Sequence, residues 1–265
     1  MKIANIQLDI AFGDPTKNYQ RTEELIKTAM KDKPDIVVLP ELWTTGYDLT
    51  RLGEIGDQNS NTTLQFFKRL AQQYNVAFVG GSIPNKNTEG IYNTLLIVDN
   101  CGNVVHQYSK LHLFKLMDEH KFLKPGNSHG LFKLKGETFA GFICYDIRFP
   151  EWIRTHTDKG AKALFMVAEW PIDRLFHWRT LLISRAIENQ AFVIACNRVG
   201  SDPNNKFAGH SMIIDPWGDV IAEASAAEEI LIGEIDLHKV TEVRKQIPIF
   251  EDRRPEYYFN KNLFD

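Results

Sequence analysis

The chain has 265 residues, enough to bury a substantial core in one large domain or two small ones. Hydrophobic residues make up 43% of it and charged residues 25%, which excludes a disordered or fibrous protein. The net charge is −3 with acidic and basic residues interspersed, so neither nucleic acid nor an anionic membrane is an expected partner. No apolar run reaches the length of a membrane span, and the first residues form a strand pattern rather than a signal peptide.

The first half of the chain alternates strand and helix patterns and then turns to strands alone. The expected elements are a strand at 2–8, a helix at 15–32, a strand at 36–40, a helix capped by Asn61 or Thr62, and strands at 76–83, 91–98 and 104–109. The last three strands are joined by short polar turns, which predicts an antiparallel meander. Region 110–130 lacks periodicity but is rich in aromatic residues and leucine, which favours a functional loop over disorder.

The second half returns to strand–helix–strand units. The expected elements are a hairpin at 131–134 and 139–144, a helix from Pro150, a strand at 163–168, a helix at 172–189, a strand at 192–196, a hairpin at 211–214 and 220–224, a strand at 230–235 and a helix at 237–246. Both halves therefore predict similar mixed sheets with helices outside. No linker is visible, so we expect residues 1–265 to form a single domain. Its aromatic tail, 248–265, should dock on the domain or on a partner subunit.

Three cysteines are present, Cys101, Cys144 and Cys196. This odd and sparse set gives no disulfide framework and is typical of the reducing cytoplasm, where we expect the protein to reside. No spacing of cysteine and histidine resembles a zinc site, so no metal is expected. Cys144 and Cys196 each end a buried strand. A loop follows Cys196, whereas a helix begins soon after Cys144, which favours Cys144 as a reactive thiol.

Two other apolar runs also end on a polar residue, Glu41 in one case and Lys110 in the other. If these strand ends converge with that of Cys144, a carboxylate, an ammonium and a thiol share one pocket. Glu41 is then a candidate general base for the thiol. Lys110 is expected to favour the thiolate and to stabilise the negative charge of a tetrahedral intermediate. The backbone N–H of Tyr145 is a second candidate donor to that oxyanion.

Three segments occur in the order of the signature segments of the nitrilase superfamily of carbon–nitrogen hydrolases: Pro40-Glu41, Lys110-Leu-His-Leu-Phe114 and Cys144-Tyr-Asp-Ile-Arg-Phe-Pro-Glu151. The chain resembles this family from Lys2 to about Ile235. The resemblance implies a four-layer α-β-β-α sandwich, a homodimer and no cofactor.

The same resemblance implies site roles. Glu41 is the base, Lys110 the oxyanion partner and Cys144 the nucleophile of a hydrolase that releases ammonia through a thioester. Glu119 lies where the family's second glutamate is expected, and its implied role is to hold Lys110 and balance its charge.

Within the family, the run 144–150, the pair Trp170-Pro171 and the segments 185–190 and 196–202 are most similar to omega-amidases. These enzymes hydrolyse the terminal amide of 2-oxoglutaramate and 2-oxosuccinamate. A small dicarboxylate mono-amide needs a cation for its distal carboxylate, and Arg148 and Arg198 are both candidates. Trp170 is a candidate pocket wall. Glu169 departs from the neutral residue expected there, and an acid near the pocket disfavours anionic substrates unless it is paired.

Nitriles and N-carbamoyl compounds stay open as substrates, because the same trio serves all of these chemistries. Two further functions belong to other classes. A metal-dependent phosphodiesterase would use Glu41, Asp146, Asp215 and a histidine such as His210. A non-catalytic binding protein on the same fold would have an unreactive Cys144.

Overall fold

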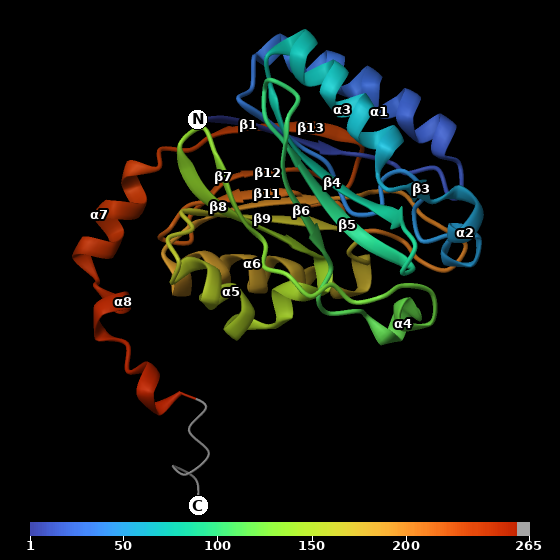
Figure 1. Cartoon of the computed structure of the whole chain (residues 1–265). Helices are drawn as coiled ribbons and strands as arrows, with labels where there is room; N and C mark the ends of the chain where they lie inside the picture. The colour runs from blue at the N-terminus through green and yellow to red at the C-terminus, as the bar shows by residue number, and fades with distance from the viewer. Residues whose placement is uncertain (259–265) are drawn as a thin grey trace, which may run out of the picture.

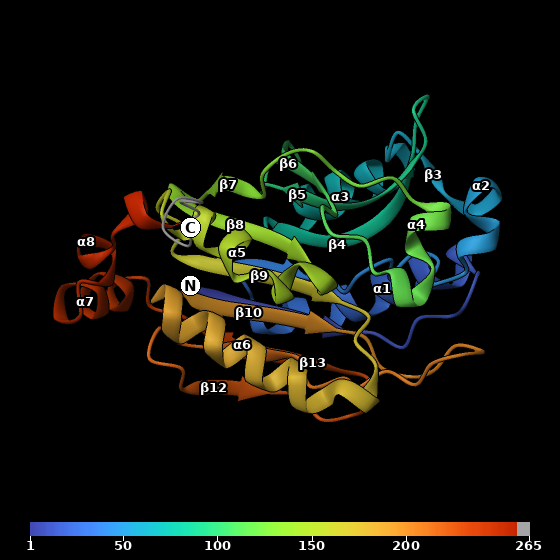
Figure 2. The same ribbon diagram turned by 90° about the horizontal axis from the view of Figure 1, so that it is seen from below.

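The computed structural model describes residues 1–258, in which two β-sheets lie face to face between two layers of helices (Figure 1). Helices α1 (Pro15–Ala29) and α3 (Asn61–Tyr74) cover the outer face of the first sheet. Helices α5 (Pro150–Thr157) and α6 (Leu175–Asn189) cover the outer face of the second, as the view from below shows (Figure 2). The predicted four-layer sandwich is confirmed.

Each sheet has a parallel centre with antiparallel strands at its sides. The first sheet runs β13 (Glu229–Glu234), β1 (Lys2–Gln7), β2 (Ile36–Val38), β4 (Ala77–Lys86), β5 (Ile91–Val98) and β6 (Val104–Ser109), with β3 (Asp57–Gln58) beside β4. The second runs β12 (Val220–Glu223), β11 (Met212–Ile214), β10 (Phe192–Asn197), β9 (Ala163–Ala168), β8 (Glu137–Ile143) and β7 (Leu131–Leu134).

The two sheets share one pairing pattern. From β13 to β6 the successive pairs are antiparallel, parallel, parallel, antiparallel and antiparallel. The second sheet gives the same succession when it is followed from β7 to β12. The prediction of two similar mixed sheets is therefore confirmed at the level of strand pairing.

Strand β1 illustrates why the strands are apolar along both faces. Ile3 packs between the two sheets, whereas Ala4 and Ile6 pack in the layer that includes α1 and α3. Strands of a sheet that is covered on both faces have nearly continuous apolar sequences, because the side chains on both faces are buried. The buried polar side chain of Asn5 donates to the carbonyl of Ala195 at 3.1 Å and so connects the sheets. This packing fixes how the ends of the strands face one another.

The irregular regions contain short helices that periodicity cannot predict. Region 110–130 holds a 3-10 turn at Lys115–Met117 and helix α4 (Glu119–Phe122), and region 42–56 holds helix α2 (Leu52–Ile55). A single helical turn is too short to show a 3.6-residue repeat. Glu119, the expected partner of Lys110, is thus the first residue of a helix.

The predicted cap of α3 was wrong. Neither Asn61 nor Thr62 caps the helix with its side chain. Instead the carboxylate of Asp57 accepts hydrogen bonds from the backbone N–H groups of Thr62 and Thr63, at 3.1 and 2.8 Å. An acidic side chain satisfies the free N–H groups of a first turn equally well from outside the helix.

Helices α7 (His238–Gln246) and α8 (Ile249–Asp252) lie beside the sandwich and lead to the C-terminus (Figure 1). The ring of Phe250 lies under two guanidinium groups, 5.3 Å from that of Arg154 and 4.6 Å from that of Arg244. The start of the tail thus contacts its own domain.

Tyr257 and Tyr258 are 44% and 46% exposed. Phe259 and Phe264, which were part of the expected docking tail, lie outside the described residues. Within residues 1–258, no helix combines the length and apolar character needed to cross a bilayer.

Candidate active site

Strand ends from both sheets meet at one edge of the sandwich. Cys144, Glu169 and Arg198 follow β8, β9 and β10, which are neighbouring parallel strands. Glu41 lies just beyond β2 and Lys110 directly follows β6 in the facing sheet. The carboxyl ends of parallel strands are the usual position of a site in such sheets.

Lys110 lies between two carboxylates. Its Nζ is 2.8 Å from Oε1 of Glu41 and 2.6 Å from Oε1 of Glu119, and all three side chains are fully buried. Burial alone would lower the pKa of Lys110, but Glu119 and Glu41 raise it well above its ordinary value. The lysine therefore stays charged, and its position is fixed from both sides.

Glu41 is held by donors on both of its carboxylate oxygens. Oε1 lies 2.8 Å from Nδ2 of Asn93 and 3.2 Å from the hydroxyl of Tyr47, in addition to Lys110. Oε2 accepts the backbone N–H of Glu169 at 2.9 Å. These contacts leave the carboxylate one orientation, which is a requirement for a positioned general base.

Glu119 is fixed by the loop that carries it. Its Oε2 accepts the backbone N–H of Phe114 at 2.7 Å, and its Oε1 accepts the hydroxyl of Tyr47 at 2.6 Å as well as Lys110. Burial raises the pKa of Glu119, while Lys110 acts against the rise.

Cys144 begins a 3-10 turn, Cys144–Arg148, and has a positive φ of 45°. A non-glycine residue in this region is strained, and such strain is common where a turn presents a nucleophile. The N–H of Tyr145, in the first turn, has no acceptor within that turn, so it remains a candidate oxyanion donor.

Lys110 favours the thiolate of Cys144, as expected, but other contributions outweigh it. Burial and the carboxylate of Glu41 raise the pKa of Cys144 well above its ordinary value, although Lys110 acts in the opposite direction. The free thiol is thus protonated at neutral pH. A reaction at this sulfur would need a base, and the carboxylate of Glu41 is adjacent.

Asp146 has a role that the sequence did not reveal. Its Oδ2 accepts the backbone N–H of Ile143 at 3.1 Å and the hydroxyl of Tyr108 at 2.8 Å. Its Oδ1 accepts both the backbone N–H and Nδ1 of His112. Tyr108 and His112 flank Lys110, so one buried carboxylate ties the lysine segment to the turn that carries Cys144.

A narrow cavity opens at the thiol. Its lining consists of Phe114, Met117, Cys144, Tyr145, Arg148, Glu169, Trp170, Pro171 and Arg174. The guanidinium of Arg148 stacks 4.9 Å from the ring of Trp170, and that of Arg174 lies 5.5 Å from the ring of Phe114. The lining therefore combines aromatic walls with two cations. The sequence indicated Arg148 and Trp170 but not Arg174.

Arg198 is bound within the protein. Its Nη1 lies 2.8 Å from Oε2 of Glu169, its Nη2 donates to the carbonyl of Ile10 at 2.8 Å, and the guanidinium stacks 4.1 Å from the ring of Phe207. Both charged side chains of the ion pair are fully buried. Glu169 is therefore paired with Arg198, as an acid beside a site for anionic substrates needs to be.

The other cysteines lie away from this cavity. Cys101 is exposed, and Cys196 lies in the core with its sulfur 3.3 Å from the carbonyl oxygen of Ile6. Burial raises the pKa of Cys196, as expected for a thiol that packs rather than reacts.

The four residues considered for a metal site bind separate partners. Glu41 contacts Lys110 and Asp146 contacts His112, as described above. Asp215 pairs with Lys239, and Nδ1 of His210 lies 2.8 Å from Glu223. Within residues 1–258, no group of three or more potential ligands is arranged to hold a metal ion.

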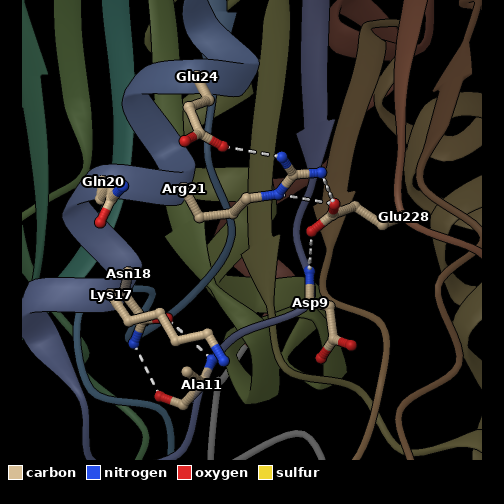
Figure 3. A pocket seen from close by; sticks show the side chains of 8 residues that line it. All are labelled: Asp9, Ala11, Lys17, Asn18, Gln20, Arg21, Glu24 and Glu228. Atoms are coloured by element: carbon tan, nitrogen blue, oxygen red, sulfur yellow. Dashed lines mark hydrogen bonds and ion pairs between the residues drawn. The ribbon is translucent and has the colours of Figure 1, made fainter.

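A larger surface hollow of about 460 Å³ lies elsewhere, between α1 and the ends of β1 and β13 (Figure 3). Its charged residues bind one another: Nε of Arg21 donates to Glu228 at 3.0 Å, and Glu228 also accepts the backbone N–H of Asp9. Its described lining contains no thiol and no hydroxyl side chain, so its size does not mark it as a site for the chemistry of Cys144.

The sandwich, with a buried thiol beside a lysine and two glutamates, has the architecture of a hydrolase of carbon–nitrogen bonds other than peptide bonds. Comparison with known proteins agrees. The chain belongs to the carbon-nitrogen hydrolase family, whose pattern matches residues 2–245.

Similar proteins include amidases. The chain is 50% identical over 256 residues to the 2-oxoglutaramate amidase of Bacillus subtilis (strain 168), covering 97% of this chain and 98% of that protein. It is 39% identical over 254 residues to omega-amidase YafV of Escherichia coli (strain K12), covering 95% and 96%. The solved structure of Saccharomyces cerevisiae Nit3, a nitrilase superfamily member, matches with a TM-score of 0.89 and 32% identity over 96% of each chain.

Proposed function

We propose that the protein is an omega-amidase, which hydrolyses small dicarboxylate mono-amides such as 2-oxoglutaramate to the acid and ammonia. The arrangement of Lys110 between Glu41 and Glu119, beside Cys144, carries this proposal. The names of two similar proteins, a 2-oxoglutaramate amidase and an omega-amidase, support the substrate class.

In the first half-reaction Glu41 takes the proton of Cys144 while the sulfur attacks the amide carbon. The raised pKa of Cys144 explains why a base is needed. Lys110 and the N–H of Tyr145 stabilise the oxyanion of the tetrahedral intermediate. Glu41 then returns its proton to the nitrogen, the C–N bond breaks, and ammonia leaves a thioester on Cys144.

In the second half-reaction Glu41 takes a proton from water, which attacks the thioester carbon. The same oxyanion donors serve again. The C–S bond breaks, and Glu41 passes its proton to the sulfur, which restores the thiol of Cys144 and the carboxylate of Glu41. Glu119 keeps Lys110 in place through both steps. No cofactor is required for this sequence of bond changes.

Two cations in the cavity lining suit a substrate with a distal carboxylate. Arg148 and Arg174 line the cavity, and each guanidinium stacks on an aromatic ring, which does not neutralise its charge. Arg198 was an equal candidate in the sequence, but it is buried against Glu169. We therefore assign the carboxylate to Arg148 and Arg174, with Trp170 as a wall.

We further propose a homodimer in the cytoplasm. Helix α6 exposes Phe176 (77%) and Ile187 (51%), and the nearby turn exposes Trp217 (40%), an apolar set that a second copy would cover. The free thiols of Cys101, Cys144 and Cys196 suit a reducing compartment. Sedimentation equilibrium tests the dimer.

Ammonia release from a panel of omega-amides, nitriles and N-carbamoyl compounds tests the function, with Cys144→Ala as the control. We expect turnover of the omega-amides and none with the variant. Preferred turnover of a nitrile or an N-carbamoyl compound would contradict the amidase assignment within this family. Full activity of Cys144→Ala would contradict the mechanism.

A further inference from the structure

Glu169 lies beside the reacting groups without a part in the proposed proton transfers. Its backbone N–H donates to Oε2 of Glu41 at 2.9 Å, which fixes the residue next to the base. It is also the one acidic residue in the described lining of the cavity that contains Cys144. Its position therefore suits a contact with the substrate.

The side chain of Glu169 has one oxygen in use and one free. Oε2 binds Nη1 of Arg198 at 2.8 Å, whereas Oε1 is buried and has no hydrogen-bond partner among residues 1–258. A buried carboxylate oxygen without a donor is costly. A donor supplied by the substrate would remove that cost.

The neighbouring groups do not supply this donor. Nε1 of Trp170 donates to the carbonyl of Arg174 at 2.8 Å, and Nη2 of Arg148 lies 3.3 Å from Nδ1 of His177. Oε1 of Glu41 already accepts hydrogen bonds from Asn93 and Lys110. A carboxamide brings two N–H donors into the cavity, and Glu169 offers the acceptor that they need.

We propose that Glu169 is a specificity-determining residue, whose free oxygen accepts a hydrogen bond from the –NH2 group of the scissile carboxamide and selects amides over esters. The inference rests on the proposed amidase function. Glu169 transfers no proton: the proton of Cys144 passes to Glu41 and then to the leaving nitrogen. As that nitrogen gains positive charge, its attraction to Glu169 increases, so the contact is strongest in the transition state.

The pKa of Glu169 sets the pH range of this acceptor role, because the free oxygen accepts a hydrogen bond only when the carboxyl group is ionised. Burial raises its pKa to about 8, and the adjacent Arg198 opposes the rise. The preference for amides should therefore increase as the pH rises and Glu169 ionises.

Glu169→Gln tests the inference because the geometry predicts how the introduced side-chain amide is oriented. Arg198 requires an acceptor, so the oxygen of the introduced amide faces Arg198 and its –NH2 group takes the place of the free oxygen. A donor then faces the donor of the substrate. Above about pH 8, where Glu169 is ionised, we expect kcat/KM for succinamate to fall by roughly 10- to 100-fold, the range for a hydrogen bond to a charged group. Hydrolysis of monomethyl succinate, whose leaving oxygen has no N–H, should change by less than about threefold.

The controls separate this role from a structural one. Glu169→Asp keeps the charge but withdraws the oxygens, and it should show the same selective loss even if Glu169→Gln fails to fold. Asp215→Asn changes a buried carboxylate far from the cavity and should leave the amide-to-ester ratio unchanged. Parallel loss of amide and ester activity in both Glu169 variants would overturn the inference. If the wild type hydrolyses neither succinate derivative, the proposed substrate fails, and the ratio is measured on the amide and ester of an acid that the enzyme accepts.

Discussion

Asp146 accepts two hydrogen bonds from His112, one from its backbone N–H at 3.1 Å and one from Nδ1 at 2.7 Å. His112 is two residues from Lys110, and Asp146 is two residues from Cys144. The pair therefore sets the distance between Lys110 and Cys144, although neither residue is part of the described lining of the cavity at the thiol.

Asp146→Asn should weaken this link, because the new –NH2 group faces a donor and leaves buried hydrogen bonds unmade. We expect kcat to fall about tenfold or more with little change in KM, and the free energy of unfolding to fall by about 1–3 kcal/mol. Asp215→Asn is the matched control, with lower stability and normal kcat. Equal kcat values in the two variants would show that Asp146 has only a structural role.

Burial of the charged cluster Lys110, Glu41 and Glu119 should lower the free energy of unfolding, even though the proposed catalysis needs these residues. Lys110→Met leaves two carboxylates unpaired, and we expect a loss of about 3–5 kcal/mol in chemical denaturation at neutral pH. A triple variant that also carries Glu41→Gln and Glu119→Gln should recover most of that stability and stay inactive. A triple variant as unstable as Lys110→Met would contradict this view of the cluster.

The raised pKa of Cys144 predicts a specific alkylation profile. A raised thiol pKa means that the thiolate appears only at alkaline pH, so the rate of iodoacetamide reaction should still be rising where a free thiol, with its pKa of about 8.5, levels off. The measurement uses a Cys101→Ser background, because Cys101 is exposed, and Cys144→Ala as the blank. If the alkylation rate reached its plateau at a pH below the pKa of a free thiol, the effect of Lys110 on the pKa of Cys144 would be larger than the combined effect of burial and Glu41.

Glu169 predicts a pH dependence of stability. Its ordinary pKa of 4.5 is raised to about 8 in the folded protein, so folding favours its protonated form. Its contribution is fully present below its ordinary pKa and is lost as the pH rises through about 8. Relative to Glu169→Gln, the wild type should therefore become less stable between about pH 5 and about pH 9. Parallel unfolding free energies across this range would contradict the raised pKa.

Much of the fold followed from the sequence because its strands are covered on both faces. Apolar runs such as 36–40 and 163–168 are long enough to mark buried strands, and the polar residues or cysteines that end such runs stand out. Glu41, Lys110 and Cys144 were found in this way. The helical turn that begins at Glu119 was not, because one turn carries no periodicity.

The remaining parts of the site depend on contacts between distant segments. Asp57 caps α3 from outside the helix, and Asn93 reaches Glu41 from another strand. The sequence left Arg198 equivalent to Arg148, since only tertiary packing brings Arg198 against Glu169. The pKa of Cys144 likewise depends on the balance between burial and three charges, which residue types alone do not define.

Detection of the acyl-enzyme tests the central claim most directly. Wild-type enzyme is mixed with succinamate, quenched in acid and analysed by peptide mass spectrometry. We predict a succinyl group on the peptide that contains Cys144, sensitive to hydroxylamine as a thioester is and missing from Cys144→Ala. Ammonia release without any adduct on Cys144, together with normal turnover by Cys144→Ala, would contradict the account.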